Sequence, residues 1–312
     1  MKLLYIQDAH LKGKNSRNRL GNYFDDCLKK IDEVIKIAKD NKCSAILDGG
    51  DLFESYNPSY SVLDALADRI DKAKIYVYSL FGNHCMNIGH INNTGLSHLQ
   101  KRSKWFKPLD SQFDLQDIDY PIKIQGFDYY YGVEEDIKKN GLNIFTDSDF
   151  NEKSWKIAIV HATITEKKFF EGVSHVTPEQ IKTNADLVLL AHIHKPYKKI
   201  VNNTTFLNIG CLCRDNIDEA KIEPSVLIID TDKRDYEIIK LKSAKKANEI
   251  FDLSKYEKIK ASEKDIKEFL NSLKNVNLQS MDLGEQITKI GNEQKVDKII
   301  IDYLLDKLGD IK

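Results

Sequence analysis

The chain has 312 residues, of which 41% are apolar and 30% are charged, and its 47 basic side chains nearly balance its 48 acidic ones. This length can hold one large domain with a sizeable core plus a smaller appendage, and the composition excludes an intrinsically disordered chain. The balanced charge gives no global field that would recruit nucleic acid or a membrane, so any affinity for DNA must come from a local patch.

The N-terminal residues and the cysteines indicate a cytoplasmic protein. The first apolar run spans only residues 3–6, too short for a signal peptide or a membrane span. The five cysteines are odd in number and scattered along the chain, so they do not suggest a disulfide framework. We therefore expect a reducing compartment and no membrane association.

The first 80 residues alternate short apolar runs with helical periodicity, which is typical of β-α-β units in a parallel sheet. Strands are predicted at 3–6, 45–47 and 75–80. Between them, apolar residues recur every three or four positions at 24–38 and 62–73, and these stripes predict two amphipathic helices.

The middle of the chain is harder to assign. Residues 86–120 have mixed character, and we expect a long excursion over the face on which the strands end. Further strands are predicted at 122–124, 155–160 and 187–190, followed by hairpins at 200–207 and 226–239. This order predicts an α/β fold in which a mixed sheet forms a two-layer β-sandwich flanked by helices.

After about residue 245 the sequence becomes rich in lysine and periodic at helical spacing. We expect residues 1–245 to form the main domain and residues 246–312 a helical C-terminal appendage. Ser262 and Asp265 match a capping box before one helix, and a last helix is predicted over 296–308. The apolar face of that last helix could dock a partner or pack on its own domain.

Side chains that bind metals follow nearly every predicted strand. Strand ends of one α/β sheet converge on one crevice, so residues from distant parts of the sequence would meet there. Histidine, carboxylate and amide ligands favour two divalent ions, Mn²⁺ first and Zn²⁺ or Fe²⁺ as alternatives. The candidate ligands are Asp8, His10, Asp51, Asn83, His161, His192 and His194.

Spacing supports the same interpretation. Asp8 and His10 are two apart in a segment expected to be extended, so they could chelate one ion, and His192 and His194 could do the same. Asp51 follows two glycines and could approach two cations closely as a bridge. Two ions roughly 3.5 to 4 Å apart would clamp a phosphate and lower the pKa of a water between them.

Each motif alone has an ordinary structural explanation. An Asp-x-His or Gly-Asp pair can form a turn or a helix cap, and a histidine ending an apolar strand can be a hydrogen-bonded core residue. The motifs occur together and in order, however, and five of the eight histidines fall within them. That combination favours a metal site.

The ordered motifs Asp8-Ala-His10, Gly50-Asp51, Gly82-Asn83-His84, His161 and His192-Ile-His194 resemble those of the calcineurin-like metallophosphoesterases over about residues 1–240. The resemblance implies two metals that share Asp51. One would be bound by Asp8, His10 and His194 as well, and the other by Asn83, His161 and His192. His84 would be catalytic, standing beside the substrate phosphate and assisting the departing oxygen.

Two residues depart from that family's pattern. Cys85 stands where an acidic residue usually follows the Asn-His pair, and Ala191 stands where glycine usually precedes the last His-x-His. Cys85 leaves the partner of His84 unassigned. It can be a small packed residue or a reactive thiol.

Within the superfamily, the chain most resembles the SbcD-type DNA-repair nucleases. The likeness lies in the early Asp-x-His-Leu, in Gly-Asp-Leu-Phe at 50–53, in Leu-Asn-Ile-Gly ending at Gly210, and in the helical C-terminal region. Residues 207–213 depart from the family's usual Asn-Pro-Gly-Ser motif. The likeness implies an exo- or endonuclease that hydrolyses DNA phosphodiester bonds. It also implies a coiled-coil SbcC-type ATPase as a partner and leaves a homodimer open.

A basic loop directly after the first candidate ligands could contact nucleic acid. Lys12, Lys14, Arg17 and Arg19 have no acidic residue among them and could hold phosphates that flank the scissile one, or could simply be solvated. Residues 167–170, two lysines and two phenylalanines, could add a stacking rim or pack beneath a loop.

Two rival functions fit the same residues. A phosphatase or cyclic-nucleotide phosphodiesterase would use the same centre on a small substrate and would not need the C-terminal region. A non-catalytic module that binds DNA ends or a partner would keep the metals for structure, and only Cys85 favours it.

Overall fold

The structure is a computed structural model, and it describes residues 1–16, 19–87, 93–109, 122–144, 154–167 and 174–254, with short stretches between 287 and 305. The chain forms two compact units. The first contains residues 1–15, 22–215 and 221–245, and the second contains 16–21, 216–220 and 246–312. The helix predicted after Ser262 and much of the last predicted helix lie outside the described residues.

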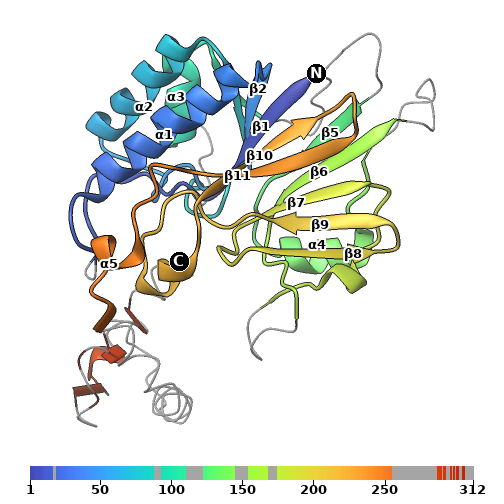
Figure 1. The fold of residues 1–312 in the computed structure, drawn as a ribbon. Coiled ribbons are helices and arrows are strands. Elements are labelled where there is room, and N and C mark those ends of the chain that lie inside the picture. The colour runs from blue at the N-terminus through green and yellow to red at the C-terminus, as the bar shows by residue number, and fades with distance from the viewer. Residues whose placement is uncertain are drawn as a thin grey trace. The chain divides into compact units, whose positions relative to one another are not determined.

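Two sheets form the framework of the first unit (Figure 1). In spatial order, the first sheet contains β11 (Asp235–Lys240), β10 (Ser225–Asp230), β1 (Lys2–Ile6), β2 (Ala45–Asp48), β3 (Tyr76–Ser79) and β4 (Phe106–Pro108). The second contains β5 (Ile122–Phe127), β6 (Trp155–His161), β7 (Leu187–Ala191), β9 (Thr204–Asn208) and β8 (Tyr197–Val201).

Both sheets are mixed. Strands β1 to β4 are parallel, as are β5, β6, β7 and β9, whereas β10 pairs antiparallel with β1 and β11, and β8 pairs antiparallel with β9. The two antiparallel hairpins, β8–β9 and β10–β11, turn where the sequence predicts. The predicted α/β fold with a two-layer sandwich is confirmed.

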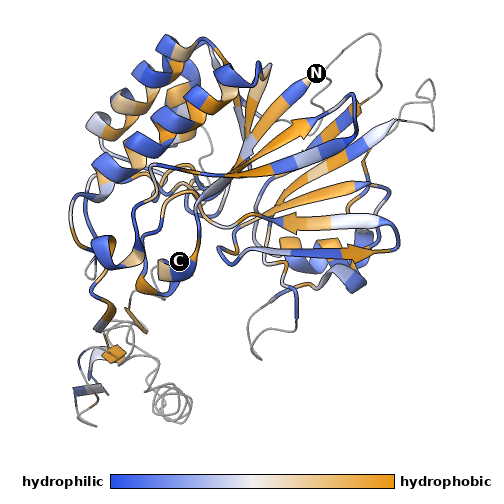
Figure 2. Ribbon diagram, viewed as in Figure 1, coloured by the Kyte–Doolittle hydropathy of each residue, from blue (hydrophilic) through white to orange (hydrophobic). Residues whose placement is uncertain are grey.

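Alternation along the strands creates three apolar layers. On β1, Leu3 and Tyr5 enter the core between the two sheets, while Leu4 and Ile6 enter the core beneath the helices. On β6, Ile157 and Ile159 face the first sheet and Ala158 and Val160 face outward. Because the central strands are buried on both faces, they are nearly continuous apolar runs, as Figure 2 shows.

Helices cover the outer face of each sheet (Figure 1). The first sheet carries α1 (Tyr23–Asp40), α2 (Tyr60–Ala73) and α3 (Gly95–Arg102), and the second carries α4 (Val133–Asn140). The sequence predicts α1 and α2. Residues 93–109 form α3 and the edge strand β4, so the expectation of an excursion is wrong for that segment. Both elements are too short to show a clear period.

The second unit has a core of its own. It includes Ile217, Ile250 and Phe251 together with Ile300 and Leu304 from the predicted last helix. A short helix, α5 (Ala247–Ile250), and a backbone hydrogen bond from Leu20 to Ile250 join its segments.

Short 3-10 helices lie at Pro178–Gln180 and Ile217–Lys221. Within the described parts of the chain, no helix combines the length and apolar character needed to span a membrane.

Candidate metal centre

The candidate ligands lie at the carboxyl ends of strands from both sheets. Asp8 and His10 follow β1, Asp51 follows β2 and Asn83 follows β3, all in the first sheet. From the second sheet, the last residue of β6 is His161, and two more histidines follow β7. Their side chains come together in the first unit because these strands point their carboxyl ends at one place.

The loops after β1 and β2 are joined side by side by backbone hydrogen bonds. The N–H of Asp8 donates to Gly50 O at 3.1 Å, and the N–H of His10 donates to Asp51 O at 2.9 Å. Asp8, His10 and Asp51 all have positive φ, at 48°, 47° and 53°. Such backbone costs about 1–3 kcal/mol per residue and persists where neighbours impose it. The expectation of an extended segment at Asp8 and His10 is therefore wrong.

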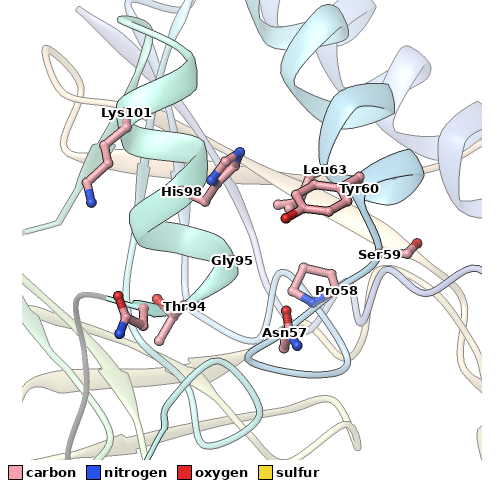
Figure 3. A pocket seen from close by; sticks show the side chains of 10 residues that line it. Asn57, Pro58, Ser59, Tyr60, Leu63, Thr94, Gly95, His98 and Lys101 are labelled. Atoms are coloured by element: carbon pink, nitrogen blue, oxygen red, sulfur yellow. The ribbon is translucent and has the colours of Figure 1, made fainter.

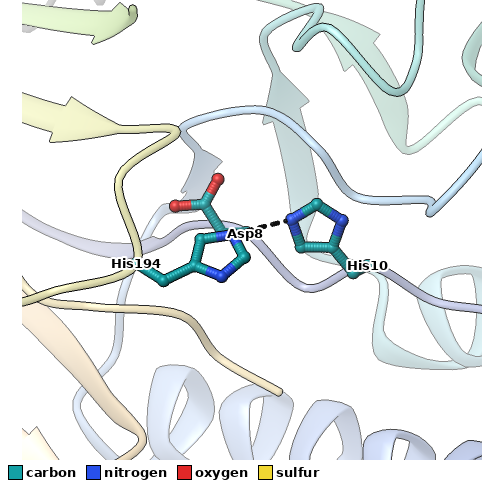
Figure 4. A group of neighbouring side chains, drawn as sticks. All are labelled: Asp8, His10 and His194. Carbon is teal, nitrogen blue, oxygen red and sulfur yellow. Dashed lines mark hydrogen bonds between the residues drawn. The ribbon is translucent and has the colours of Figure 1, made fainter. Parts of the chain in front are cut away.

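The first ligand group contains Asp8, His10 and His194, whose ligand atoms all lie within 4.8 Å of one another. The Nε2 atoms of His10 and His194 face each other at 3.0 Å (Figure 4). The Asp8 carboxylate is held by the backbone N–H of His192, at 3.1 and 3.2 Å, and by the side-chain amide of Gln7, at 2.9 Å. This group thus joins the first loop of one sheet to the β7 loop of the other.

The second group contains Asp51, His161 and His192, again within 4.8 Å of one another. Asn83 belongs to it, because its Oδ1 lies 3.2 Å from His161 Nε2 and 2.9 Å from His192 Nδ1. The other ring nitrogen of His161, Nδ1, lies 2.9 Å from Gly49 O, which fixes the ring. His161 Nε2 is thereby directed at the group.

Asp51 lies between the two groups. Its Oδ2 is 3.1 Å from His161 Nε2, in the second group, and 4.0 Å from His10 Nε2, in the first. Its Oδ1 accepts a hydrogen bond from the backbone N–H of His84 at 3.0 Å. A carboxylate in this position can contact two cations at once.

The two histidines after β7 belong to different groups. His192 has a φ of 81°, and it joins Asp51 and His161, whereas His194 joins Asp8 and His10. The geometry therefore favours one histidine for each metal, the division implied by the family resemblance, over chelation of one ion by both residues.

Two glycines allow this close approach. A Cβ at Gly82 would lie 2.1 Å from Asp51 Oδ1. A Cβ at Gly50, where φ is 104°, would lie 2.6 Å from His161 Nδ1. Only glycine fits at either position without displacing a candidate ligand.

Opposite charges are concentrated in this buried site. Burial lowers the pKa of His10, but Glu54 and Asp51 outweigh it and raise that pKa to about 10. Burial likewise lowers the pKa of His161, but Asp51 raises it to about 9. Burial raises the pKa of Asp51, yet the imidazoles of His161 and His10 hold it well below its usual range. Burial and the neighbouring His161 lower the pKa of His192 to about 3.

This donor set fits two divalent cations. Metals bind neutral imidazole and ionised carboxylate, so cations would replace the protons that the negative site holds on His10 and His161. Imidazole, carboxylate and amide donors suit Mn²⁺, Zn²⁺ or Fe²⁺. In such a site, the facing Nε2 atoms of His10 and His194 would both bind the same ion.

His84 lies beside the first group. Its Nδ1 is 3.0 Å from the backbone oxygen of Glu54, and its ring contacts the ring of His10 edge-on at a centroid distance of 4.8 Å. Cys85 is buried, its thiol donates to Phe53 O at 3.5 Å, and burial raises its pKa. Cys85 is thus a packed residue, and Glu54 supplies the partner of His84. Glu54 is not among the site residues predicted from the sequence. The only signal for it in the sequence is that it is an acidic residue three positions after Asp51.

The basic residues predicted to contact DNA lie in different environments. Lys12 forms ion pairs with Asp215 and, at 3.3 Å, with Glu54. Arg19 is buried, with its guanidinium 5.6 Å from the ring centroid of Phe251. Lys14 is exposed, and Arg17 lies outside the described residues, as do residues 168–170 of the proposed stacking rim. Among the described members of the loop, Lys14 is the cation that faces solvent.

A separate pocket of about 510 Å³ lies between the starts of α2 and α3 (Figure 3). Tyr60, Thr94, His98 and Lys101 help to line it. None of the candidate metal ligands lines this pocket. His98 is therefore a histidine outside the candidate metal centre.

Comparison with known proteins gives a family match and distant relatives. The model of the calcineurin-like phosphoesterase family matches residues 1–196. The DNA double-strand break repair protein Mre11 of Methanosarcina mazei is 23% identical over 209 residues, which cover 64% of this chain and 31% of that protein. Mre11 of Methanosarcina acetivorans is 21% identical over 209 residues with the same coverage. The match thus spans about a third of these relatives.

Solved structures give weaker likenesses. A novel archaeal phosphodiesterase is matched with a TM-score of 0.41 and 16% identity, over 77% of this chain and 100% of that one. TT1561 of Thermus thermophilus is matched with a TM-score of 0.46 and 13% identity, over 77% of this chain and 98% of that one.

Proposed function

Because the chain belongs to the calcineurin-like phosphoesterase family, a family of metal-dependent phosphoesterases, we propose that its two ligand groups hold two divalent metal ions at one active site. The position of Asp51 carries this proposal, since its carboxylate contacts both groups. The first ion would be held by Asp8, His10, His194 and Asp51. The second would be held by Asp51, Asn83, His161 and His192.

Within this site the protein supplies binding, orientation and a proton. When bound, two divalent ions polarise a phosphate ester and supply a nucleophile from water near neutral pH. The Glu54 carbonyl can only accept a hydrogen bond, so Nδ1 of His84 carries a proton. Nε2 of His84 carries a second proton only when the ring is cationic. We propose that this cation faces the phosphate and delivers its Nε2 proton to the leaving oxygen.

We propose that the substrate is DNA and that the reaction is hydrolysis of its phosphodiester bonds. The similarity to two DNA double-strand break repair proteins supports this choice over a small-molecule phosphatase or cyclic-nucleotide phosphodiesterase. Exposed Lys14 stands four residues after His10 and could contact a phosphate next to the scissile one.

Replacing Lys14 and Arg17 with serine tests the choice of substrate. We expect weaker cleavage of duplex DNA and a flatter salt dependence, by close to one unit of logarithmic slope for each lost phosphate contact. Hydrolysis of a small chromogenic diester should stay at the parental rate. The measurements are initial rates on both substrates at several salt concentrations, with Lys233→Ser as the control, because Lys233 is an exposed cation on the β10–β11 turn.

Equal losses on both substrates would show that the loop shapes the centre rather than gripping DNA. Unchanged DNA cleavage and an unchanged salt slope would contradict a role of this loop in DNA binding and favour a small substrate.

The SbcC-type ATPase partner and the homodimer remain predictions. Ile300 and Leu304, described residues of the face expected to dock a partner, are buried in the core of the second unit. This burial favours the alternative, packing of that face within its own unit.

A further inference from the structure

Glu54 contacts three side chains, two of which belong to the candidate centre. Its carboxylate Oε2 lies 2.9 Å from His10 Nδ1, and its Oε1 lies 3.3 Å from Lys12 Nζ. Its backbone oxygen is the partner of His84 Nδ1 at 3.0 Å. One residue therefore lies against a candidate ligand and the proposed catalytic histidine.

The backbone places Glu54 independently of its side chain. Leu11 and Phe53 form a parallel bridge, and the N–H of Glu54 donates to Leu11 O at 3.2 Å. The loops after β1 and β2 are thus held in a register that puts position 54 beside His10. A substitution at Glu54 keeps the carbonyl that contacts His84 and removes only what the carboxylate does.

The carboxylate can fix the ring of His10. A histidine that binds a metal through Nε2 must carry its proton on Nδ1, and an acceptor at Nδ1 sets that tautomer, orients the ring and increases its basicity. His10 Nε2 already faces His194 Nε2, within the first ligand group. The buried Nδ1 of His10 forms no hydrogen bond of good geometry in this structure, and Glu54 Oε2, 2.9 Å away, is the carboxylate oxygen placed to become its acceptor.

Two further residues hold the Glu54 carboxylate in place. Its Oε1 lies 3.3 Å from Lys12 Nζ. Lys12 is anchored in turn by Asp215, which comes from a distant part of the chain. An ion pair thus holds the carboxylate beside His10.

We propose that Glu54 is a positioning residue that orients His10 for the first metal and strengthens binding at that site alone. This role rests on the proposed two-metal centre. The second site, built from Asn83, His161 and His192 with Asp51, has no contact with the Glu54 side chain among the interactions described here. The proposal therefore predicts a loss confined to one of two sites.

The test is titration of metal-stripped protein with Mn²⁺ by calorimetry, for the parent chain, Glu54→Gln and Glu54→Ala. Loss of a partner to a metal ligand costs about 10–100-fold in affinity. We expect Glu54→Ala to weaken one site by about 100-fold and leave the other near its parental value. Glu54→Gln keeps an acceptor oxygen without the charge, so we expect an intermediate loss.

Glu33→Gln is the control, because that carboxylate accepts hydrogen bonds from the backbone N–H groups of Lys242 and Ser243 and contacts none of the candidate ligands among the interactions of the described residues. It should bind both metals as the parent chain does. Parental affinity at both sites in Glu54→Ala would overturn the proposal while leaving the two-metal function intact. An equal loss at both sites would also overturn it, since that result indicates a loosened loop. A parent chain that binds fewer than two ions would refute the proposed function itself.

Discussion

Asp51→Asn should abolish hydrolysis and remove metal from both sites. The amide cannot supply the negative charge that offsets two dications in this buried site. Loss of metal stabilisation of the transition state amounts to several kcal/mol, and about 4 kcal/mol corresponds to a decrease of about 10³-fold in rate. The measurements are metal content by elemental analysis and turnover of a small chromogenic diester.

The control for this variant is Asp186→Asn. Asp186 is a carboxylate at the amino end of β7, where it accepts a hydrogen bond from the backbone of Lys156 at 2.8 Å. It should keep its metals and its rate. An Asp51→Asn protein that retained two metals and near-parental turnover would refute the assignment of Asp51 as the bridge.

His84→Ala should keep both metals and lose about 10²- to 10⁴-fold in rate, as expected for a residue that transfers a proton in the transition state. Its ring is held by the Glu54 carbonyl at one side of the first ligand group, so removing it leaves the proposed ligands in place. The measurement pairs metal content with kcat on the same diester.

His98→Ala is the matched control, because His98 lines the separate pocket between α2 and α3. It should behave like the parent chain. A ring nitrogen of His84 also lies within 4.8 Å of ligand atoms of His10 and Asp51. Loss of metal from His84→Ala would therefore mean that His84 is a ligand and that the proposed division of roles is wrong.

Elements with a clear apolar run or a long apolar stripe could be predicted from the sequence, and short elements without either could not. The strands β1, β2, β6 and β7 are apolar runs because they are buried on both faces, and α1 carries a stripe over many turns. In contrast, α3 and α4 have eight residues each and β4 has three, too few to show a clear period.

The residues of the site could be predicted, but much of their geometry could not. The candidate ligands could be predicted because they follow predicted strands, and parallel strands bring their carboxyl ends together. The left-handed backbone at Asp8 and His10 depends on hydrogen bonds to a loop some forty residues away, which no local pattern encodes. The same register places Glu54 at His10. Lys12 is paired with Asp215 across a separation of 203 positions, so its partner could not be read from the basic loop.

The most direct test of the two-metal centre is a stoichiometric titration of metal-stripped protein with Mn²⁺ while hydrolysis of a chromogenic diester is followed. We expect two ions to bind per chain and activity to stay low until the second site fills, because Asp51 joins the two groups into one reacting unit. Full activity in the metal-stripped protein, or activity that reaches its maximum with a single bound ion, would contradict the account.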